Sequence, residues 1–179
     1  MNDHKKRIYL ASINHPISRF WQDLAKDLGE AVNFTFSYIE IDIDLNLFYS
    51  EERKQYHSTL ILSKILNHLP DDGEKIIGVA NVDIFIPILT FLFGEAQLGG
   101  RGAIVSTYRL HNEFYGLPPD DRLLYTRTVK EVLHELGHLL GLVHCRDYEC
   151  VMHSSTYVGD IDLKKAQFCT ACQRLLSKG

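Results

Sequence analysis

Residues 134–144 read HELGHLLGLVH, an HExxHxxGxxH motif that organises the interpretation of the whole chain. On a helix, His134 and His138 lie four residues apart and therefore share one face. Two neutral imidazoles on one face can bind a zinc ion. Gly141 can adopt a left-handed conformation that ends the helix, so that the chain turns back and presents His144 as a third ligand. Three protein ligands with a fourth position open are typical of a catalytic zinc site.

Glu135 directly follows the first histidine of the motif. At this position its carboxylate can act as a general base toward a water molecule, as in metal-dependent proteases. The alternative is a buried helix whose histidines have no chemical role. Five fixed residues at this spacing rarely occur together by chance, which argues against that alternative. The motif therefore predicts metal-assisted hydrolysis.

All four cysteines of the chain follow the motif in two pairs, Cys145 with Cys150 and Cys169 with Cys172. Two such pairs fit a tetrahedral, structural four-thiolate zinc site. The alternatives are two disulfides, four unrelated thiols or a redox-active C-x-x-C pair. Disulfides suit secreted proteins, and residues 1–7 lead into no cleavable signal peptide. A redox pair would sit near a βαβ pattern, whereas we expect Cys169 and Cys172 late in a C-terminal helix.

Met152 lies eight residues after His144. This spacing predicts a Met-turn, in which the methionine thioether packs beneath the three histidines. Cys145 directly follows His144, so the cysteine site would stiffen the loop that carries the third histidine ligand.

Length and composition limit the classes of protein to which the chain can belong. Its 179 residues fit one domain, and its hydrophobic content of 45% suffices for an ordinary core. The net charge is −4 and no basic stripe is present, which argues against nucleic-acid and membrane-surface binding. The longest apolar run, residues 84–93, contains a proline and is too short to cross a bilayer. We expect a cytoplasmic monomer whose partner is a peptide or protein substrate.

Hydrophobic periodicity predicts alternating strands and helices. We expect strands at 8–13, 33–44, 75–85 and 101–110, and helices at 17–32, 51–69, 122–140 and 160–176. The apolar stripe of the motif helix should face the sheet, and it consists of Val129, Val132, Leu133, Leu136 and Leu140. This order indicates an α/β (α+β) fold with a mixed sheet of about four to five strands packed with helices. If the strand at 102–110 forms the sheet edge above the metal, an extended peptide could pair with it.

Several other polar residues could be mistaken for ligands. Asp42 and Asp44 are interpreted as solvated residues at a strand end, and His111 as a surface or hydrogen-bonded residue. His153 is left out because three histidines already complete the site. Asp162 and Lys164 could steady the cysteine-bearing loop, although an exposed helix start explains them equally well.

The histidine motif, the cysteine pair that opens at Cys145, Met152 and the FCTAC segment at 168–172 together resemble the archaemetzincins. These are metzincin-like zinc peptidases with a second zinc site built from four cysteines. Three upstream segments, at 82–85, 91–96 and 105–110, also resemble this family. The resemblance covers most of the chain.

The resemblance implies two zinc ions. The catalytic ion would be bound by His134, His138 and His144, with Glu135 as the general base. The structural ion would be bound by Cys145, Cys150, Cys169 and Cys172. Some metzincins add a tyrosine ligand two residues after the turn methionine, and Ser154 stands there in this chain.

The resemblance also implies a metzincin-like fold with the active-site helix under a cleft and a small C-terminal part with the structural zinc. Residues 1–179 would form a single domain with an N-terminal subdomain at 1–140 and a C-terminal subdomain at 141–179. The family implies zinc-dependent peptidase activity, with aminopeptidase-like behaviour in some members. The rival interpretation is a non-enzymatic zinc module that binds peptides through a vestigial active site.

Overall fold

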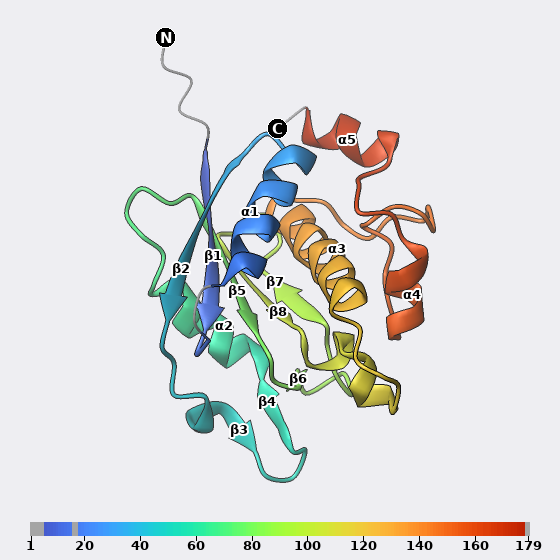
Figure 1. The fold of residues 1–179 in the computed structure, drawn as a ribbon. Coiled ribbons are helices and arrows are strands. Elements are labelled where there is room, and N and C mark those ends of the chain that lie inside the picture. Colours follow the sequence, from blue (N-terminus) through green and yellow to red (C-terminus); the bar gives the residue numbers. More distant parts are fainter. Residues whose placement is uncertain (1–5, 16–17, 178–179) are drawn as a thin grey trace.

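A five-stranded sheet forms the centre of the molecule (Figure 1). The computed structural model describes residues 6–15 and 18–177. The strand order is β2-β1-β5-β8-β7, in which the first four strands are parallel and β7 is antiparallel to β8. The sheet is therefore mixed, as the sequence predicts. The strands are β1 (Arg7–Ile13), β2 (Thr35–Ile41), β5 (Lys75–Ala80), β7 (Gly94–Ala96) and β8 (Gly102–Ser106).

Helices cover both faces of this sheet, with α1 (Arg19–Ala31) and α3 (Asp121–Leu139) on one face and α2 (Ser58–Leu66) on the other. Val132, Leu133 and Leu136 of α3 are fully buried in one cluster with residues of β1, β5 and β8. Burial of each such leucine stabilises the fold by about 1.5–3 kcal/mol. The predicted apolar stripe thus faces the sheet, with Leu140 only partly buried at its end.

The prediction of a helix at 51–69 is wrong for residues 51–57. Residues 49–57 instead form β3 (Tyr49–Ser50) and β4 (Gln55–His57), which join β6 (Ile84–Phe85) in a second sheet of three strands. Lys54, in the turn between β3 and β4, has a φ of 55°, which a right-handed helix does not accommodate. The strand predicted at 75–85 is likewise divided between β5 and β6.

Residues 102–110 do not form the edge of the sheet, so the condition for a peptide to pair with this strand is not met. β8 lies between β5 and β7, and the 3-10 helix η2 (Tyr108–Leu110) follows it. The edge strand on this side of the sheet is β7, which the sequence did not reveal because it has only three residues, none of them a strong strand former. Two further 3-10 helices are η1 (Leu45–Phe48) and η3 (Asn112–Tyr115).

The single helix predicted at 160–176 is divided in the structure. It consists of α4 (Val158–Leu163) and α5 (Thr170–Leu176), which lie beside α3 in Figure 1. Lys164 adopts an extended conformation (ψ of 154°) and ends α4. Cys169 is the N-cap of α5 and Cys172 lies in its first turn, so the placement of both cysteines late in a helix is wrong.

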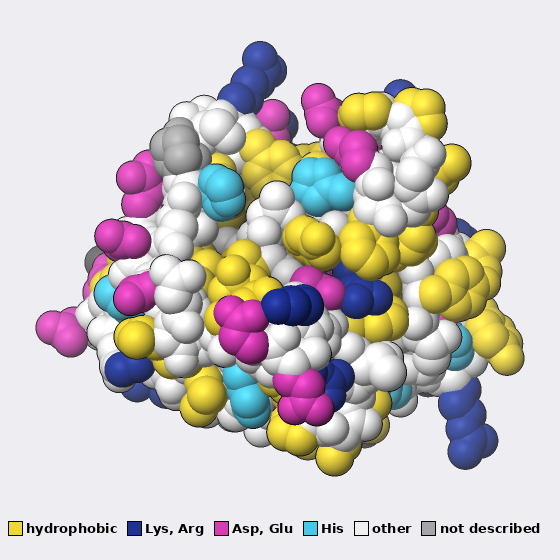
Figure 2. Space-filling view, turned by 90° about the horizontal axis from the view of Figure 1, so that it is seen from below, with side chains coloured by type: hydrophobic (Ala, Val, Ile, Leu, Met, Phe, Trp, Pro, Cys, Tyr) yellow, Lys and Arg dark blue, Asp and Glu magenta, His cyan; other side chains and the backbone are white. Residues whose placement is uncertain are grey.

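Ile17, at the predicted start of the first helix, and residues 1–5 of the predicted N-terminal segment lie outside the described residues. Among the described residues, no helix combines the length and apolar character needed to cross a bilayer. Acidic and basic side chains are interspersed on the face shown in Figure 2, and the described residues form no broad basic patch there.

Candidate metal centres

The helix that carries the motif is capped at both ends. At its start, the Asp120 carboxylate accepts a hydrogen bond from the backbone N–H of Leu123 (2.8 Å). At its end, Gly141 has a φ of 92°, and the N–H of Leu142 donates to the carbonyl of Gly137. The predicted left-handed glycine is therefore confirmed. This turn reverses the chain and returns His144 to the helix.

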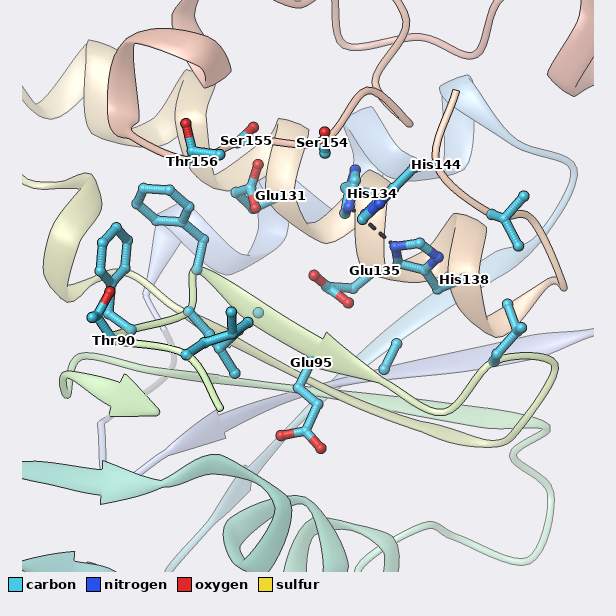
Figure 3. A pocket seen from close by; sticks show the side chains of 18 residues that line it. Thr90, Glu95, Glu131, His134, Glu135, His138, His144, Ser154, Ser155 and Thr156 are labelled. Atoms are coloured by element: carbon cyan, nitrogen blue, oxygen red, sulfur yellow. Dashed lines mark hydrogen bonds between the residues drawn. The ribbon is translucent and has the colours of Figure 1, made fainter. Parts of the chain in front are cut away.

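The three motif histidines converge at one point above α3 (Figure 3). One ring nitrogen from each lies within 4.8 Å of the other two, so the group could hold a metal ion. The Nε2 atoms of His134 and His138 are 3.1 Å apart. His134 is buried, His138 is half-buried and His144 is exposed, so the group opens to solvent on one side.

Two backbone carbonyls determine which nitrogens of the first two imidazoles carry the proton. His134 Nδ1 lies 2.7 Å from the Val151 carbonyl oxygen, and His138 Nδ1 lies 2.8 Å from that of Leu142. A carbonyl can only accept, so in the neutral rings both protons are on Nδ1. Two Nε2 lone pairs then face each other, an arrangement that a cation between them would stabilise. Tetrahedral zinc places its nitrogen ligands about 3.3 Å apart, so the donor set fits the metal.

Burial keeps these imidazoles in the neutral form that binds metals. It lowers the pKa of His134 to about 3, and the nearby ammonium of Lys164 contributes to the shift. The pKa values of His138 and His144 are lowered for the same main reason. The lowered pKa values therefore favour the neutral, singly protonated form of all three rings near neutral pH.

Glu135 is buried and points into the space between the histidines and β7 (Figure 3). Burial raises the pKa of its carboxyl well above the usual range, and the neighbouring Glu131 adds to the shift. Its closest neighbour on the sheet edge is Gly94. A methyl group there would lie 2.5 Å from Glu135 Oε1 and 2.7 Å from its Cγ and Cδ, which is closer than atoms can approach.

We therefore expect Gly94→Ala to displace the Glu135 carboxylate with little loss of stability, because the flexible end of that side chain can move. A shift of about 1 Å in a reacting group can lower kcat by roughly 100-fold. Steady-state kinetics, metal content and thermal unfolding of the variant would be compared with those of Ala96→Ser on the same strand. A Gly94→Ala protein with the kcat of the parent would contradict this account of the close approach.

Met152 is fully buried beneath α3. A side chain at Gly137, between the two helical histidines, would overlap the Met152 sulfur. The N–H of Cys145 donates to the Met152 carbonyl (2.9 Å), which links the methionine segment to the residue after His144. Met152 therefore packs against the motif helix at Gly137, between the positions of His134 and His138 in the chain.

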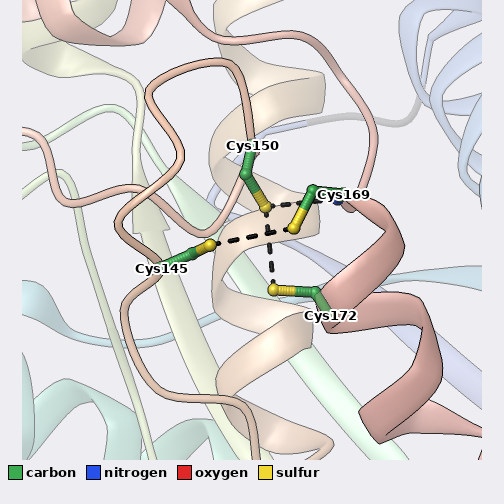
Figure 4. Close-up of side chains that lie close together, drawn as sticks. All are labelled: Cys145, Cys150, Cys169 and Cys172. Atoms are coloured by element: carbon green, nitrogen blue, oxygen red, sulfur yellow. Dashed lines mark hydrogen bonds between the residues drawn. The ribbon is translucent and has the colours of Figure 1, made fainter.

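The four cysteines form a second group that could hold a metal ion (Figure 4). The Sγ atoms of Cys145 and Cys169 are 3.8 Å apart, and those of Cys150 and Cys172 are 3.7 Å apart. Zinc–sulfur bonds of about 2.3 Å in a tetrahedron separate neighbouring sulfurs by about 3.8 Å. A disulfide requires about 2.05 Å, and all four thiols are free. The arrangement therefore fits zinc and not the two-disulfide alternative.

A buried lysine supports the carbonyl that orients the first histidine. The Val151 carbonyl that orients His134 also accepts a hydrogen bond from Lys164 Nζ (3.4 Å), whose side chain is fully buried. Asp162 forms a two-point ion pair with Arg127 of α3 at 2.7 and 2.8 Å. Both residues therefore hold the C-terminal segment against α3, and neither belongs to an exposed helix start.

The remaining polar residues lie outside both groups. Asp42 and Asp44 are exposed after β2, and Asp44 caps η1. His111 lies 3.8 Å from a carboxylate oxygen of Glu113. His153 Nδ1 donates to the Cys145 carbonyl (2.9 Å) and thereby supports the loop.

The histidine group lies in a cleft of ≈ 670 Å³. Residues 89–98, including β7, form one wall, α3 forms the floor, and residues 154–156 form the other wall. Sequence reasoning missed two residues that line the cleft, Gly94 in the wall formed by β7 and Glu131 in the floor formed by α3. Glu131 lies four residues before Glu135, so the helical period does place both on one face, whereas Gly94 gave no comparable local signal.

Comparisons with known proteins agree with this geometry. Residues 37–178 match the model of Peptidase family M54. The archaemetzincin of Methanocaldococcus jannaschii is 41% identical over 167 residues, which cover 93% of this chain and 89% of that protein. The crystal structure of archaemetzincin from Methanopyrus kandleri superposes with a TM-score of 0.86 at 30% identity, covering 99% of this chain and 97% of that one. A zinc-dependent peptidase from Methanocorpusculum labreanum gives a TM-score of 0.82 at 29% identity, covering 94% and 99%.

The mixed α/β fold, the histidine group in an open cleft and the match to the family model together show that this protein is a zinc metallopeptidase. The chain belongs to peptidase family M54, and its resemblance to the archaemetzincins is confirmed.

Proposed function

We propose that His134, His138 and His144 bind a catalytic zinc ion and that Glu135 is the general base of peptide-bond hydrolysis. The observation that carries this proposal is the pair of Nε2 atoms, 3.1 Å apart, whose partner Nδ1 atoms are both held by backbone carbonyls. Zinc at this position supplies Lewis acidity, which lowers the pKa of a water molecule to about 7 and polarises a substrate carbonyl.

The chain's own residues handle the protons. The Glu135 carboxylate accepts the proton of the attacking water and later donates it to the nitrogen of the leaving amine. Its burial favours this role, because a raised pKa makes the protonated form accessible between the two transfers. The Val151 and Leu142 carbonyls hold the imidazole planes in place throughout.

The edge strand β7 orients the substrate in this proposal. Ser106 N–H donates to the Phe93 carbonyl, and Gln97 N–H donates to that of Gly102, so alternate residues of the strand face β8. The backbone groups of Gly94 and Ala96 then point outward along the cleft. An extended peptide would add to this edge and pass its backbone above Glu135.

We further propose that Cys145, Cys150, Cys169 and Cys172 bind a second, structural zinc ion. Thiolates remain available for zinc in a reducing compartment, which supports a cytoplasmic location. We propose that residues 1–179 form one domain, with subdomains at 1–140 and 141–179. The protein would act as a monomer on peptides or proteins. It would have no nucleic-acid or membrane partner. The contacts of buried Lys164 with Val151 and Glu131, and the ion pair of Asp162 with Arg127, hold residues 141–179 against α3 and support a single domain.

Metal removal tests the proposed function. The purified protein should contain two zinc ions per chain by elemental analysis and should cleave members of a broad peptide library. Exhaustive chelation should abolish cleavage, because both the nucleophile and the polarised carbonyl depend on the metal, and added zinc should restore it. One zinc ion with no cleavage would favour the non-enzymatic binding module. Thiols that respond to oxidant without metal loss would favour a redox role.

A further inference from the structure

One end of the cleft contains polar atoms that the proposed mechanism does not use. Glu131 Oε1 and Ser155 Oγ are both buried, and neither has a hydrogen-bond partner among the described residues. Both residues line the cleft: Glu131 lies on α3 one helical turn before Glu135, on the side away from His138, and Ser155 lies in the wall at 154–156. The Glu131 side chain is only 4% exposed. Buried acceptors without a partner are unfavourable, so this pair indicates a ligand group that donates to them.

Lys164 does not satisfy this requirement. Its Nζ lies 3.8 Å from Glu131 Oε1, beyond hydrogen-bonding distance, and donates to the Val151 carbonyl instead. The lysine therefore forms an ion pair with Glu131 that offsets part of its charge, while Oε1 remains enclosed and without a hydrogen-bond donor among the described residues. Lys164 is fully buried behind Glu131 and is not one of the residues that line the cleft.

The walls around this pair suit the stem of a long side chain. Phe91 and Phe93 line the same end of the cleft, with ring centroids 5.3 Å apart in an edge-to-face contact. Aromatic walls accept methylene groups, and the carboxylate and hydroxyl accept a polar tip. Burial raises the pKa of Glu131, and the ammonium groups of Lys164 and Lys130 oppose that shift; the ionised carboxylate would repel a substrate carboxylate with little water to screen the charge.

We propose that Glu131, Ser155, Phe91 and Phe93 form a specificity subsite for an N–H donor side chain next to the scissile bond. A lysine ammonium or a glutamine amide fits this chemistry, and an acidic side chain is excluded. This inference rests on the proposed peptidase function. It assigns to Glu131 a role in substrate selection that is separate from the role of Glu135.

The test uses N-acetylated peptides that differ only at the residue beside the cleaved bond, which is lysine, glutamine, norleucine or glutamate. We expect kcat/KM for lysine and glutamine to exceed that for norleucine about tenfold and that for glutamate about 100-fold. In Glu131→Gln the glutamine-to-glutamate ratio should fall to about threefold or less. Ser155→Ala should reduce the preference for lysine and glutamine over norleucine, and it provides a second variant if Glu131→Gln folds poorly.

Binding separates a failure of this inference from a failure of the proposed function. The same peptides would be titrated calorimetrically into zinc-loaded Glu135→Gln protein. Selective binding of lysine and glutamine peptides without any cleavage by the parent would retain the subsite and remove the peptidase assignment. Equal cleavage of the norleucine peptide, or ratios unchanged in both subsite variants, would overturn the subsite while the peptidase stands. A preference seen only with a free amino terminus would overturn its assignment to a side chain.

Discussion

Replacement of Glu135 by glutamine should lower kcat by about 1,000-fold, within the range that a positioned general base contributes. The amide keeps the shape of the side chain in its contact with Gly94 but cannot accept the proton of water. Zinc content should stay at the parent value, because the three imidazoles and their backbone carbonyls are unchanged. Stability should not fall, since burial already disfavours the charged form of this carboxyl, whose pKa is raised.

Single-turnover kinetics, elemental analysis and thermal unfolding would be measured together on Glu135→Gln. The matched control is Glu113→Gln, which makes the same chemical change at an exposed glutamate outside the cleft. Turnover within a few-fold of the parent in the Glu135 variant would remove the base assignment. Loss of zinc in that variant would show that Glu135 acts through the metal site.

Replacement of Cys169 by serine should cause the largest loss of stability, on the order of 4 kcal/mol, because structural zinc contributes folding free energy directly. For a chain of this size that corresponds to a fall in Tm of roughly 10 °C. The structural reason is that Cys169 begins α5 and faces Cys145, so one metal ion would connect two segments that are distant in sequence. Without it, the loop after His144 loses its anchor.

Differential scanning calorimetry and zinc analysis would test this expectation, with Thr170→Ser as the control at the adjacent exposed position of α5. We expect one zinc ion to be lost from Cys169→Ser and the affinity of the remaining ion to fall. The second effect follows because Cys145 shares its backbone with His144 and bonds to the Met152 carbonyl. An equally stable variant with both ions retained would exclude a structural role for the cysteine group.

Local sequence predicted the centre of the site well. The four-residue spacing of His134 and His138, the left-handed Gly141 and the return of His144 all depend on interactions within one helix and its C-terminal turn. The two cysteine pairs were informative for a similar reason, because metal ligands occur at short, characteristic spacings. Four of the five strands of the central sheet followed from hydrophobic periodicity, although their boundaries did not.

The errors fall where tertiary contacts outweigh local preference. Tyr56 and His57 pair with β6 instead of continuing a helix, and α4 ends at Lys164, whose ammonium donates a hydrogen bond to the Val151 carbonyl. The edge strand β7 is too short and too rich in small residues to have a periodic signal. Its identity depends on β8, with which it pairs.

The sequence by itself therefore determined which side chains could bind metal, because ligand type and helical spacing are local properties. Only the tertiary structure decided how that chemistry is arranged: which carbonyls orient the imidazoles, which strand borders the cleft, and which residue of that strand approaches Glu135. These depend on contacts between segments far apart in the chain, as between Val151 and His134 or Gly94 and Glu135. Such contacts arise when burial of the core brings the segments together, and no short-range pattern encodes them.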